Sequence, residues 1–415
     1  MLDALPLVFV LVGVALYTVL AGADFGAGFW QLFAGRGAQG ERIREHAHNS
    51  MAPVWEANHV WLIFVLTVFW TAYPTAFGSI ASTLAVPLFI AGIGIVLRGA
   101  AYVVRDGTSN PRELRLVDAV FSASSILTPF ALGAAVGAIA SNRVPVGNAT
   151  GDEFSSWLNP TSILIGALAV VSSAYLAAVF LAADAARVGE PRLQDALRRR
   201  ALGTGIFAGA VALGGLAVLH SDADPLFHEL LSGGALVAVI GSALAGMSTF
   251  TLVYRRRFEA ARYSAAVAVA AIVAGWALAR WPTILPGLTV QQAAASHDTL
   301  VTLIAAVLAG GAILFPSLAL LFRLALTGRF EHSEPAAAES ASRRRAPGMP
   351  RPMTRSAVAC LIAGIGLLTV ADAGWAHAAG VVALFGFMIS AFLVIVPAAL
   401  TDEEARASSP TRTAE

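Results

Sequence analysis

Residues 4–34 read ALPLVFVLVGVALYTVLAGADFGAGFWQLFA, and Asp24 is the one charged side chain among them. A helix needs about 20 apolar residues to cross the hydrocarbon core of a membrane. Backbone groups in lipid must be satisfied within their own segment, so an apolar run of this length forms a helix. The stretch therefore predicts a membrane-spanning helix. Because no basic segment precedes it, we expect it to be retained rather than cleaved as a signal peptide.

Similar runs recur along the chain, which has 415 residues, of which 57% are hydrophobic and 13% charged. The mean hydropathy is +0.72. Soluble domains carry about 25% charged residues, so most of this surface is expected to face lipid. The sequence predicts an all-α polytopic membrane protein with a nine-span helical core and a C-terminal two-helix extension. The predicted spans are 4–34, 51–72, 77–104, 115–140, 160–184, 199–219, 231–254, 263–281, 298–327, 356–371 and 379–400.

Arginine marks alternate loops between these spans, and the chain contains no lysine. Cytoplasmic loops of membrane proteins carry an excess of basic residues. We therefore expect the N-terminus outside and the C-terminus in the cytoplasm. The gathering of Arg in alternate short loops thus indicates membrane topology, and it does not favour nucleic-acid binding. The Arg-rich loops are 35–50, 105–114, 185–198, 255–262 and 328–355; the Arg-poor loops are 73–76, 141–159, 220–230 and 282–297.

The domain organisation follows from the same pattern. Residues 1–327 form the predicted nine-helix membrane domain, and residues 354–400 form a C-terminal transmembrane helical pair. Between them, residues 328–353 are rich in Ala, Ser, Pro and Arg, which is typical of a flexible linker, here cytoplasmic. Residues 401–415 form a cytoplasmic tail. The single cysteine, Cys360, excludes a disulfide within the chain.

Three charged residues fall at membrane depth, where charge is costly and is a functional candidate by default. Asp24 and Arg98 each lie about 20 residues into helices that enter from outside, and Glu56 lies about one turn into a helix that enters from inside. The three are therefore expected at one level near the cytoplasmic face. Burial raises the pKa of an acid and a nearby Arg lowers it, so such a group could load a proton. An ion-paired helix clamp and interfacial charges that reach water are the alternatives.

His59 follows Glu56 by three residues, a spacing that can belong to a di-metal site in helix bundles. Such a site needs a second pair and further Glu residues on other helices, and the other predicted helices do not supply them. The sequence thus predicts no metal site, and it singles out no certain catalytic residue. His220, His228 and His297 fall near the outer side, away from His59, so we expect no haem held by a His pair.

Two sequence motifs and one residue carry a resemblance. Residues 22–28 read GADFGAG at the end of the first predicted helix, where Gly22 and Gly26 give a small-xxx-small packing face. Residues 49–63 read NSMAPVWEANHVWLI and include Trp55, Asn58 and Trp61. Together with Arg98, these segments resemble subunit II of cytochrome bd-type quinol oxidases. The resemblance covers about residues 1–327, with weaker support from residues 157–160 and 282–300.

The resemblance implies a bacterial inner-membrane complex that oxidises quinol at the outer side and reduces dioxygen to water in aerobic respiration. Its haem b and haem d groups would lie mainly in subunit I, the partner in a heterodimer. Subunit II would support assembly and proton delivery, and a structural quinone is known in the family. Asp24, Glu56 and Arg98 match positions linked to a proton path, and His59 joins them as a predicted member.

The chain departs from the family pattern in several places. Many members carry an Asp where Ala21 stands, which puts a two-carboxylate site on the first helix in doubt. Glu56 replaces a frequent Asp, and His59 replaces a frequent Gln. The region beyond residue 330 lies outside the pattern. Its helical pair either covers a lipid-facing surface, as a small accessory subunit does, or is an inert extension.

Two other functions suit a polytopic chain with buried acids. One is a proton-coupled secondary transporter, although such proteins often bind substrate at the membrane midplane and the charges here gather near one face. The other is a structural scaffold without a proton role. Uptake by proteoliposomes without a partner would favour the transporter, and unchanged turnover after substitution of Asp24 and Glu56 would favour the scaffold.

Overall fold

The computed structural model describes residues 2–107 and 111–326, together with scattered positions between 356 and 390. Side chains are described over these residues except 51–57, 106–112 and several between 315 and 326. The predicted linker 328–353 and tail 401–415 lie outside the described residues. The chain divides into two compact units, Met1–Leu314 and Phe315–Glu415.

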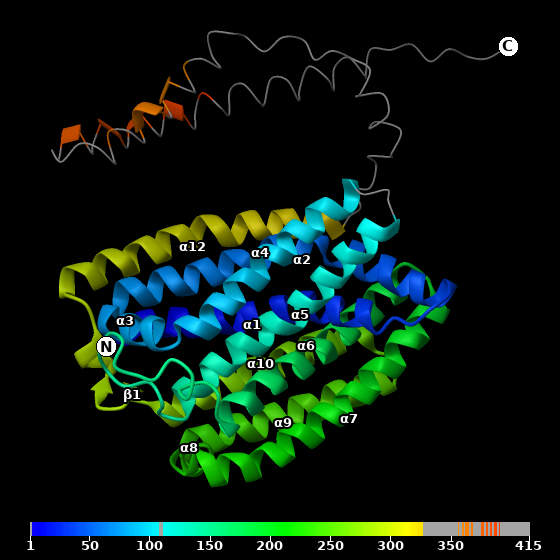
Figure 1. Cartoon of the computed structure of the whole chain (residues 1–415), viewed down its shortest axis with the longest axis horizontal. Coiled ribbons are helices and arrows are strands. Elements are labelled where there is room, and N and C mark those ends of the chain that lie inside the picture. Colours follow the sequence, from blue (N-terminus) through cyan, green and yellow to red (C-terminus); the bar gives the residue numbers. More distant parts are fainter. Residues whose placement is uncertain are drawn as a thin grey trace. The chain divides into compact units, whose positions relative to one another are not determined.

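The described residues are almost entirely helical, which confirms the expected all-α fold (Figure 1). Two very short strands, β1 (Thr283–Leu285) and β2 (Leu288–Thr289), form an antiparallel hairpin. The helices are α1 (Leu5–Leu32), α2 (Ala38–Ala72), α3 (Pro74–Thr83), α4 (Ala85–Gly107), α5 (Pro111–Ala140), α6 (Pro160–Arg187), α7 (Pro191–Asp222), α8 (Asp224–Leu230), α9 (Gly233–Tyr254), α10 (Phe258–Arg280), α11 (Val290–Ala293) and α12 (His297–Leu326).

Eight described helices are long and apolar enough to cross a membrane: α1, α4, α5, α6, α7, α9, α10 and α12. The second predicted span, 51–72, corresponds to the end of α2. This helix has 35 residues, and its apolar part among the described side chains is Asn58–Ala72. The count of nine core spans therefore stays a prediction, while the multi-helix membrane architecture does not depend on it.

Several predicted loops are shorter than expected because the helices extend past their apolar parts. The prediction of a loop at 35–50 is wrong, since α2 begins at Ala38. Ile43 and Ala47, four residues apart, are both buried, so the start of α2 is amphipathic rather than irregular. The same holds for α7, which begins at Pro191 and not near 199. Hydropathy detects the lipid-facing part of a helix and misses such ends.

The third predicted span, 77–104, is divided into α3 and α4. Leu84 leaves the helical conformation, with φ −101° and ψ 25°. Pro87 follows in the first turn of α4 and has no N–H to donate to the carbonyl of Thr83. The missing backbone hydrogen bond explains why one apolar run forms two helices.

Helix α1 lies in the centre of the first unit and packs against α2, α5 and α6. Its contact with α6 is close. A Cβ atom added at Gly22 would lie 2.8 Å from Leu176 Cδ1, and one added at Gly26 would overlap the Ser173 carbonyl. Glycine is therefore required at Gly26 for the two backbones to approach. Trp30 at the end of α1 donates from Nε1 to the Ala174 carbonyl oxygen at 2.7 Å.

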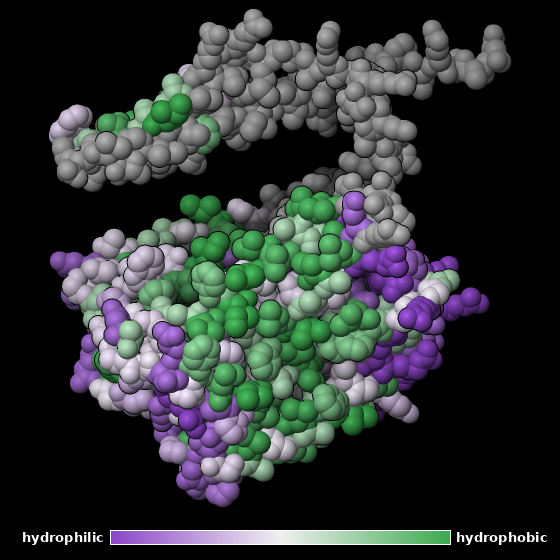
Figure 2. Space-filling view, in the orientation of Figure 1, coloured by the Kyte–Doolittle hydropathy of each residue, from purple (hydrophilic) through white to green (hydrophobic). Residues whose placement is uncertain are grey.

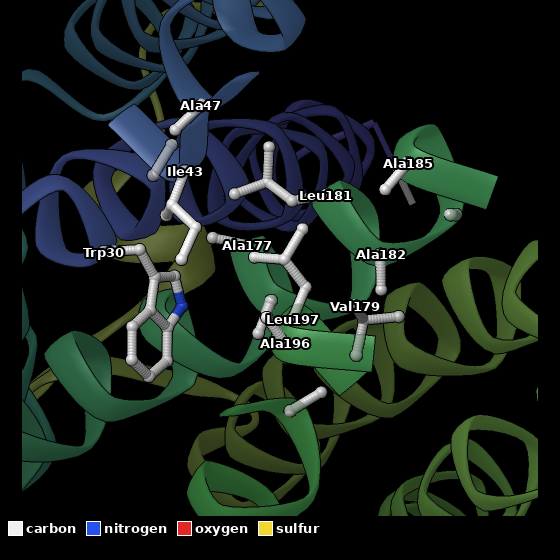
Figure 3. Packing of buried hydrophobic residues seen from close by; sticks show 14 of the residues in the cluster. Trp30, Ile43, Ala47, Ala177, Val179, Leu181, Ala182, Ala185, Ala196 and Leu197 are labelled. Atoms are coloured by element: carbon white, nitrogen blue, oxygen red, sulfur yellow. The ribbon is translucent and has the colours of Figure 1, made fainter. Parts of the chain in front are cut away.

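Small side chains fill the core around this contact (Figure 3). Trp30 and Ile43 are the large members on α1 and α2, and they face alanines and a few larger aliphatic side chains of α6 and α7. Residues of this kind allow close helix packing where helix association cannot rely on water exclusion. A second buried cluster joins the other ends of α2 and α5 with α3, the β-hairpin and the start of α12.

Large apolar side chains remain exposed on the outward faces of the helices. Figure 2 shows them as a broad band, with hydrophilic side chains gathered toward the two ends of the helices. Only 6% of the most apolar part of α7 and 11% of that of α9 is buried, compared with 56% for α5. A surface of this kind suits lipid or a membrane-embedded partner, because it would be unfavourable in water.

The predicted C-terminal helical pair is described only at scattered positions between 356 and 390, and these are helical. A Cβ atom added at Gly386 would lie 3.4 Å from Cys360 Sγ. The two predicted helices of this unit therefore contact each other at this point.

Candidate functional site

The structure pairs Asp24 of α1 with Arg98 of α4 in the interior of the first unit. Both residues are 1% exposed. Arg98 Nη2 forms an ion pair with Asp24 Oδ1 and also donates to the Asp24 backbone carbonyl oxygen at 2.8 Å. These residues are 74 positions apart in the sequence, and the structure brings them into contact.

A third helix reaches the same carboxylate. Asn58 of α2 is fully buried, and its Nδ2 donates to Asp24 Oδ2 at 3.0 Å. Glu56 lies on the same helix two residues earlier, about 3 Å along the axis, and its side chain is outside the described ones. One carboxylate thus joins α1, α2 and α4.

Arg98 is enclosed by α5 as well. Its Nη1 donates to Ser125 Oγ, and its guanidinium carbon lies 4.1 Å from the Phe121 ring centroid and 5.1 Å from that of Phe25. Cation–π contacts of this kind stabilise a desolvated guanidinium. Gly28 leaves the necessary space, because a Cβ atom there would overlap Ser125 Oγ and lie 2.8 Å from Arg98 Nη1.

Several buried polar atoms on the helices that form this group make no hydrogen bond within the described residues. They include Asn58 Oδ1 and Arg98 Nε in the cluster itself, Thr128 Oγ1 on α5 and both amide atoms of Gln31 on α1. Buried polar atoms are normally satisfied, and water is a common partner. The helices that form the cluster, α1, α2, α4 and α5, therefore have unused hydrogen-bonding capacity.

The remaining predicted site residues lie on α2. His59 is half-buried, and Trp61 is 7% exposed and packs edge-on against Phe64 with ring centroids 6.0 Å apart. The side chain of Trp55 is outside the described ones. A role for His59 or Glu56 in proton transfer stays a prediction.

A second carboxylate–arginine cluster, which the sequence did not single out, lies where α6 ends. Asp184 Oδ1 pairs with Arg262 Nη2 of α10 at 2.7 Å and with Arg187 of α6. The Arg262 guanidinium carbon lies 4.9 Å from the Phe180 ring centroid. The cluster adjoins a surface pocket of about 420 Å³ whose lining includes Arg187, Arg256 and Arg257. The sequence does contain one sign of this cluster: at the end of an apolar run, Asp184 is followed three residues later by Arg187.

A third group, His220, Asp224 and His228, lies at the end of α7 and on α8. Its side chains are exposed, and the two imidazoles approach one carboxylate oxygen at 3.1 Å and 3.4 Å. The spacing of four residues between successive members was visible in the sequence and was not used there.

The histidines of this chain do not suit a haem held between two imidazoles, as far as the described residues extend. His46, His48 and His59 share one helix, α2, so they cannot face one another across a porphyrin. His46 Nε2 lies 3.1 Å from the Leu181 carbonyl oxygen. His220 and His228 converge on a carboxylate at the surface.

Comparison with known proteins identifies the family. The family model for cytochrome bd terminal oxidase subunit II matches residues 2–325, most of the chain. The bd oxidase structure from Geobacillus thermodenitrificans is similar in fold, with a TM-score of 0.63 and 24% sequence identity; the match covers 79% of this chain and 99% of that one.

Curated relatives match shorter regions. Cytochrome bd ubiquinol oxidase subunit 2 of Bacillus subtilis is 29% identical over 127 residues, 30% of this chain and 37% of the relative. Cytochrome bd-I ubiquinol oxidase subunit 2 of Escherichia coli K12 is 29% identical over 169 residues, 39% of this chain and 43% of the relative. The matched regions thus span less than half the length of these two relatives.

Proposed function

The chain belongs to the cytochrome bd terminal oxidase subunit II family, and on this premise we propose that it acts in a quinol-oxidising, dioxygen-reducing membrane complex. The complex would transfer electrons from quinol to dioxygen, forming water, in aerobic respiration. Family membership implies a partner, subunit I, and a multi-pass location in the bacterial plasma membrane. The transporter alternative is not favoured, because the family match extends over residues 2–325.

Within this complex, we assign the haem b and haem d groups to subunit I, and the redox chemistry with them. This chain would support assembly and deliver protons from the cytoplasm to subunit I. The Arg-rich loops support an N-terminus outside and a C-terminus in the cytoplasm. The exposed apolar faces of α7, α9 and α12 offer surface to lipid, to a structural quinone or to a partner subunit.

The observation that carries the proton role is the buried Asp24–Arg98 pair. The adjacent guanidinium stabilises the carboxylate against the cost of burial. A carboxylate held by two donors from different helices can exchange a proton without a large movement of the backbone. Asn58 Oδ1 and Arg98 Nε have no hydrogen-bond partner among the described residues, so each can hold a water molecule next to the acid.

Glu56 supplies a second acid at the same height on α2, and His59 follows it by one turn. Gln31 lies two turns beyond Asp24 toward the Arg-rich end of α1, and Thr128 lies beside Ser125 on α5. These polar groups support a hydrogen-bonded route that passes through the Asp24 cluster. Proton entry would come from the Arg-rich end.

Purification of the protein with its co-purifying partners tests the complex-level proposal. We expect haem b and haem d absorbance and quinol-dependent oxygen consumption. A purified complex that contains no haem would contradict the oxidase assignment. Uptake activity of the chain alone in proteoliposomes would instead support a transporter.

Substitution tests the proton role separately. We expect Asp24→Asn and Glu56→Gln to slow turnover per haem, or to change its pH dependence, in the complex that still assembles. Asp298→Asn is the matched control, because Asp298 is fully exposed at the start of α12. Unchanged turnover and pH dependence in both variants would leave the family assignment standing and remove the proton path.

A further inference from the structure

The end of α7 and the short helix α8 bring two histidines and one aspartate together at the protein surface. His220 Nδ1 lies 3.1 Å from Asp224 Oδ1, and His228 Nε2 lies 3.4 Å from the same oxygen. One possible ligand atom from each of the three residues lies within 4.8 Å of the others. The side chains are 54–68% exposed, so ions in the aqueous phase can reach them.

The local sequence explains this convergence. Residues four apart on a helix share a face, and the three residues are spaced by four. The chain leaves the helix only at Ala223, with φ −139° and ψ 51°, and α8 begins at the next residue. Asp224 therefore lies between an imidazole from the last turn of α7 and one from the last turn of α8.

We propose that His220, Asp224 and His228 form a binding site for a divalent transition-metal ion of the Zn²⁺ class. Zinc bonds to imidazole nitrogen and carboxylate oxygen are about 2.0–2.2 Å long, so tetrahedral geometry separates neighbouring ligand atoms by about 3.4 Å. The two nitrogen–oxygen separations are already 3.1 Å and 3.4 Å. The ligand atoms of the three residues all lie within 4.8 Å of one another, so side-chain rotations that bring the two imidazoles closer would place one ion among the three groups.

The donor set determines which ions fit. Two imidazoles favour Zn²⁺, Cu²⁺ or Ni²⁺, whereas Mg²⁺ and Ca²⁺ prefer sites made of oxygen ligands. His220 would bind through Nδ1 and His228 through Nε2. Three protein ligands leave the fourth tetrahedral position to water.

The site lies next to a junction that already connects distant parts of the chain. Asp222 accepts from the Thr161 backbone N–H at 3.1 Å and from its hydroxyl at 2.7 Å, and it pairs with Arg143 at 2.7 Å. A metal ion bound two residues further on would fix the turn between α7 and α8. The proposed role is therefore a clasp that fixes the α7–α8 turn from which Asp222 reaches the start of α6, and it does not depend on the oxidase function.

Zinc titration of the full-length protein, purified with its co-purifying chains and carrying a tag without histidine, tests the site. After removal of bound metal with a chelator, ZnCl₂ is titrated calorimetrically. We expect one site that is weakened at least about tenfold in His220→Ala, Asp224→Asn and His228→Ala, because loss of even an outer-shell partner of a zinc ligand costs about 10–100-fold in affinity. A tenfold excess of MgCl₂ should not displace the zinc.

The matched control is His297→Ala. His297 also pairs with a carboxylate, Asp298, at 3.5 Å and is more exposed, and the pair has no third member within the described residues. This variant should bind zinc like the wild type. An equal loss of zinc in the control would mean general histidine binding and would overturn the proposal, as would displacement by Mg²⁺.

Thermal unfolding gives a second readout. A ligand that binds only the folded state raises the melting temperature, so zinc should raise it in the wild type and in His297→Ala but not in the three site variants. Without zinc, the site variants should have the same melting temperature as the wild type, because the altered side chains are exposed. Absence of a zinc-dependent shift in the wild type would contradict the proposed clasp.

Discussion

The two carboxylate–arginine clusters of the first unit have similar chemistry and different surroundings. Asp24 and Asp184 are both buried, at 1% and 8% exposure, and each is paired with an Arg from another helix. The cations differ more. The Arg98 side chain is 1% exposed, whereas those of Arg262 and Arg187 are 18% and 46% exposed.

The difference lies in how each charge could be stabilised if its partner were lost. Asp184 shares two arginines and adjoins a pocket at the surface, so water and the second cation remain available. Asp24 lies among four helices and depends on Arg98 and Asn58. A buried pair is costly to break because the remaining charge has nothing to replace its partner. We therefore expect the Asp24 cluster to be the less tolerant of substitution.

Arg98→Ala should have the largest effect, because it leaves the Asp24 carboxylate buried without a cation. Removal of one partner from a buried pair costs about 3–5 kcal/mol. We expect a large loss of folded complex, measured by yield after detergent extraction and by melting temperature. The double variant with Asp24→Asn should recover part of the loss, since the unpaired charge is gone. If Arg98→Ala alone melted at the wild-type temperature, the expected contrast between the two clusters would be wrong.

Gly28→Ala tests the space around the same pair. The new Cβ would overlap Ser125 Oγ and crowd Arg98 Nη1. Overpacking of a well-packed core costs about 1–3 kcal/mol of folding free energy. We therefore expect a lower melting temperature for this variant. Gly92→Ala on α4 is the control, because nothing lies within 4 Å of its added Cβ. Equal effects of the two variants would show that the packing around Arg98 is not tight.

Arg262→Ala should destabilise the protein less than Arg98→Ala. Hydrogen bonds to charged groups contribute about 1.5–3 kcal/mol, and Arg187 still pairs with Asp184 after the substitution, so we expect the lower end of this range. Chemical or thermal unfolding of the purified complex measures it. A loss as large as that of Arg98→Ala would mean that solvent and Arg187 do not compensate, and the contrast between the clusters would fail.

Glu41→Gln measures the effect of breaking an ion pair at the exposed surface. Glu41 pairs with Arg44 at 2.8 Å near the start of α2, and its side chain is 69% exposed. Pairs at this helical spacing contribute about 0.2–0.5 kcal/mol and weaken with salt. The melting temperature should change little, and the small difference should disappear at high ionic strength. A larger change would imply that Glu41 has a further contact in the complex.

The sequence predicted the Asp24 cluster in part. Counting residues along helices of known direction placed Asp24 and Arg98 at one level, because helix rise converts sequence position into depth. Asn58 was noticed only as part of a motif. Ser125 and Phe121 could not be predicted, since a serine or phenylalanine on an apolar helix gives no sign of which neighbour it will contact.

Other features were missed for different physical reasons. Asp184 lies at the end of an apolar run, where a charge is expected to reach water, and its burial results from Arg262 on another helix. Helix ends were misplaced at α2 and α7 because amphipathic turns outside the bilayer do not differ from loops in mean hydropathy. The α3–α4 break depends on one missing hydrogen bond at Pro87, which is a local effect within a uniformly apolar run.

The close contact between α1 and α6 also bears on the order of events during synthesis. Trp30 and its partner Ala174 are separated by 144 residues, and Asp24 precedes Arg98 by 74. At about 5–20 residues per second, roughly 7–30 s pass between translation of Trp30 and that of its partner. By the same rate, Asp24 waits roughly 4–15 s for its counter-ion Arg98, in a helix that has already been made. Until then the carboxyl group lacks its buried cation, so its charge has to be offset by water or removed by protonation.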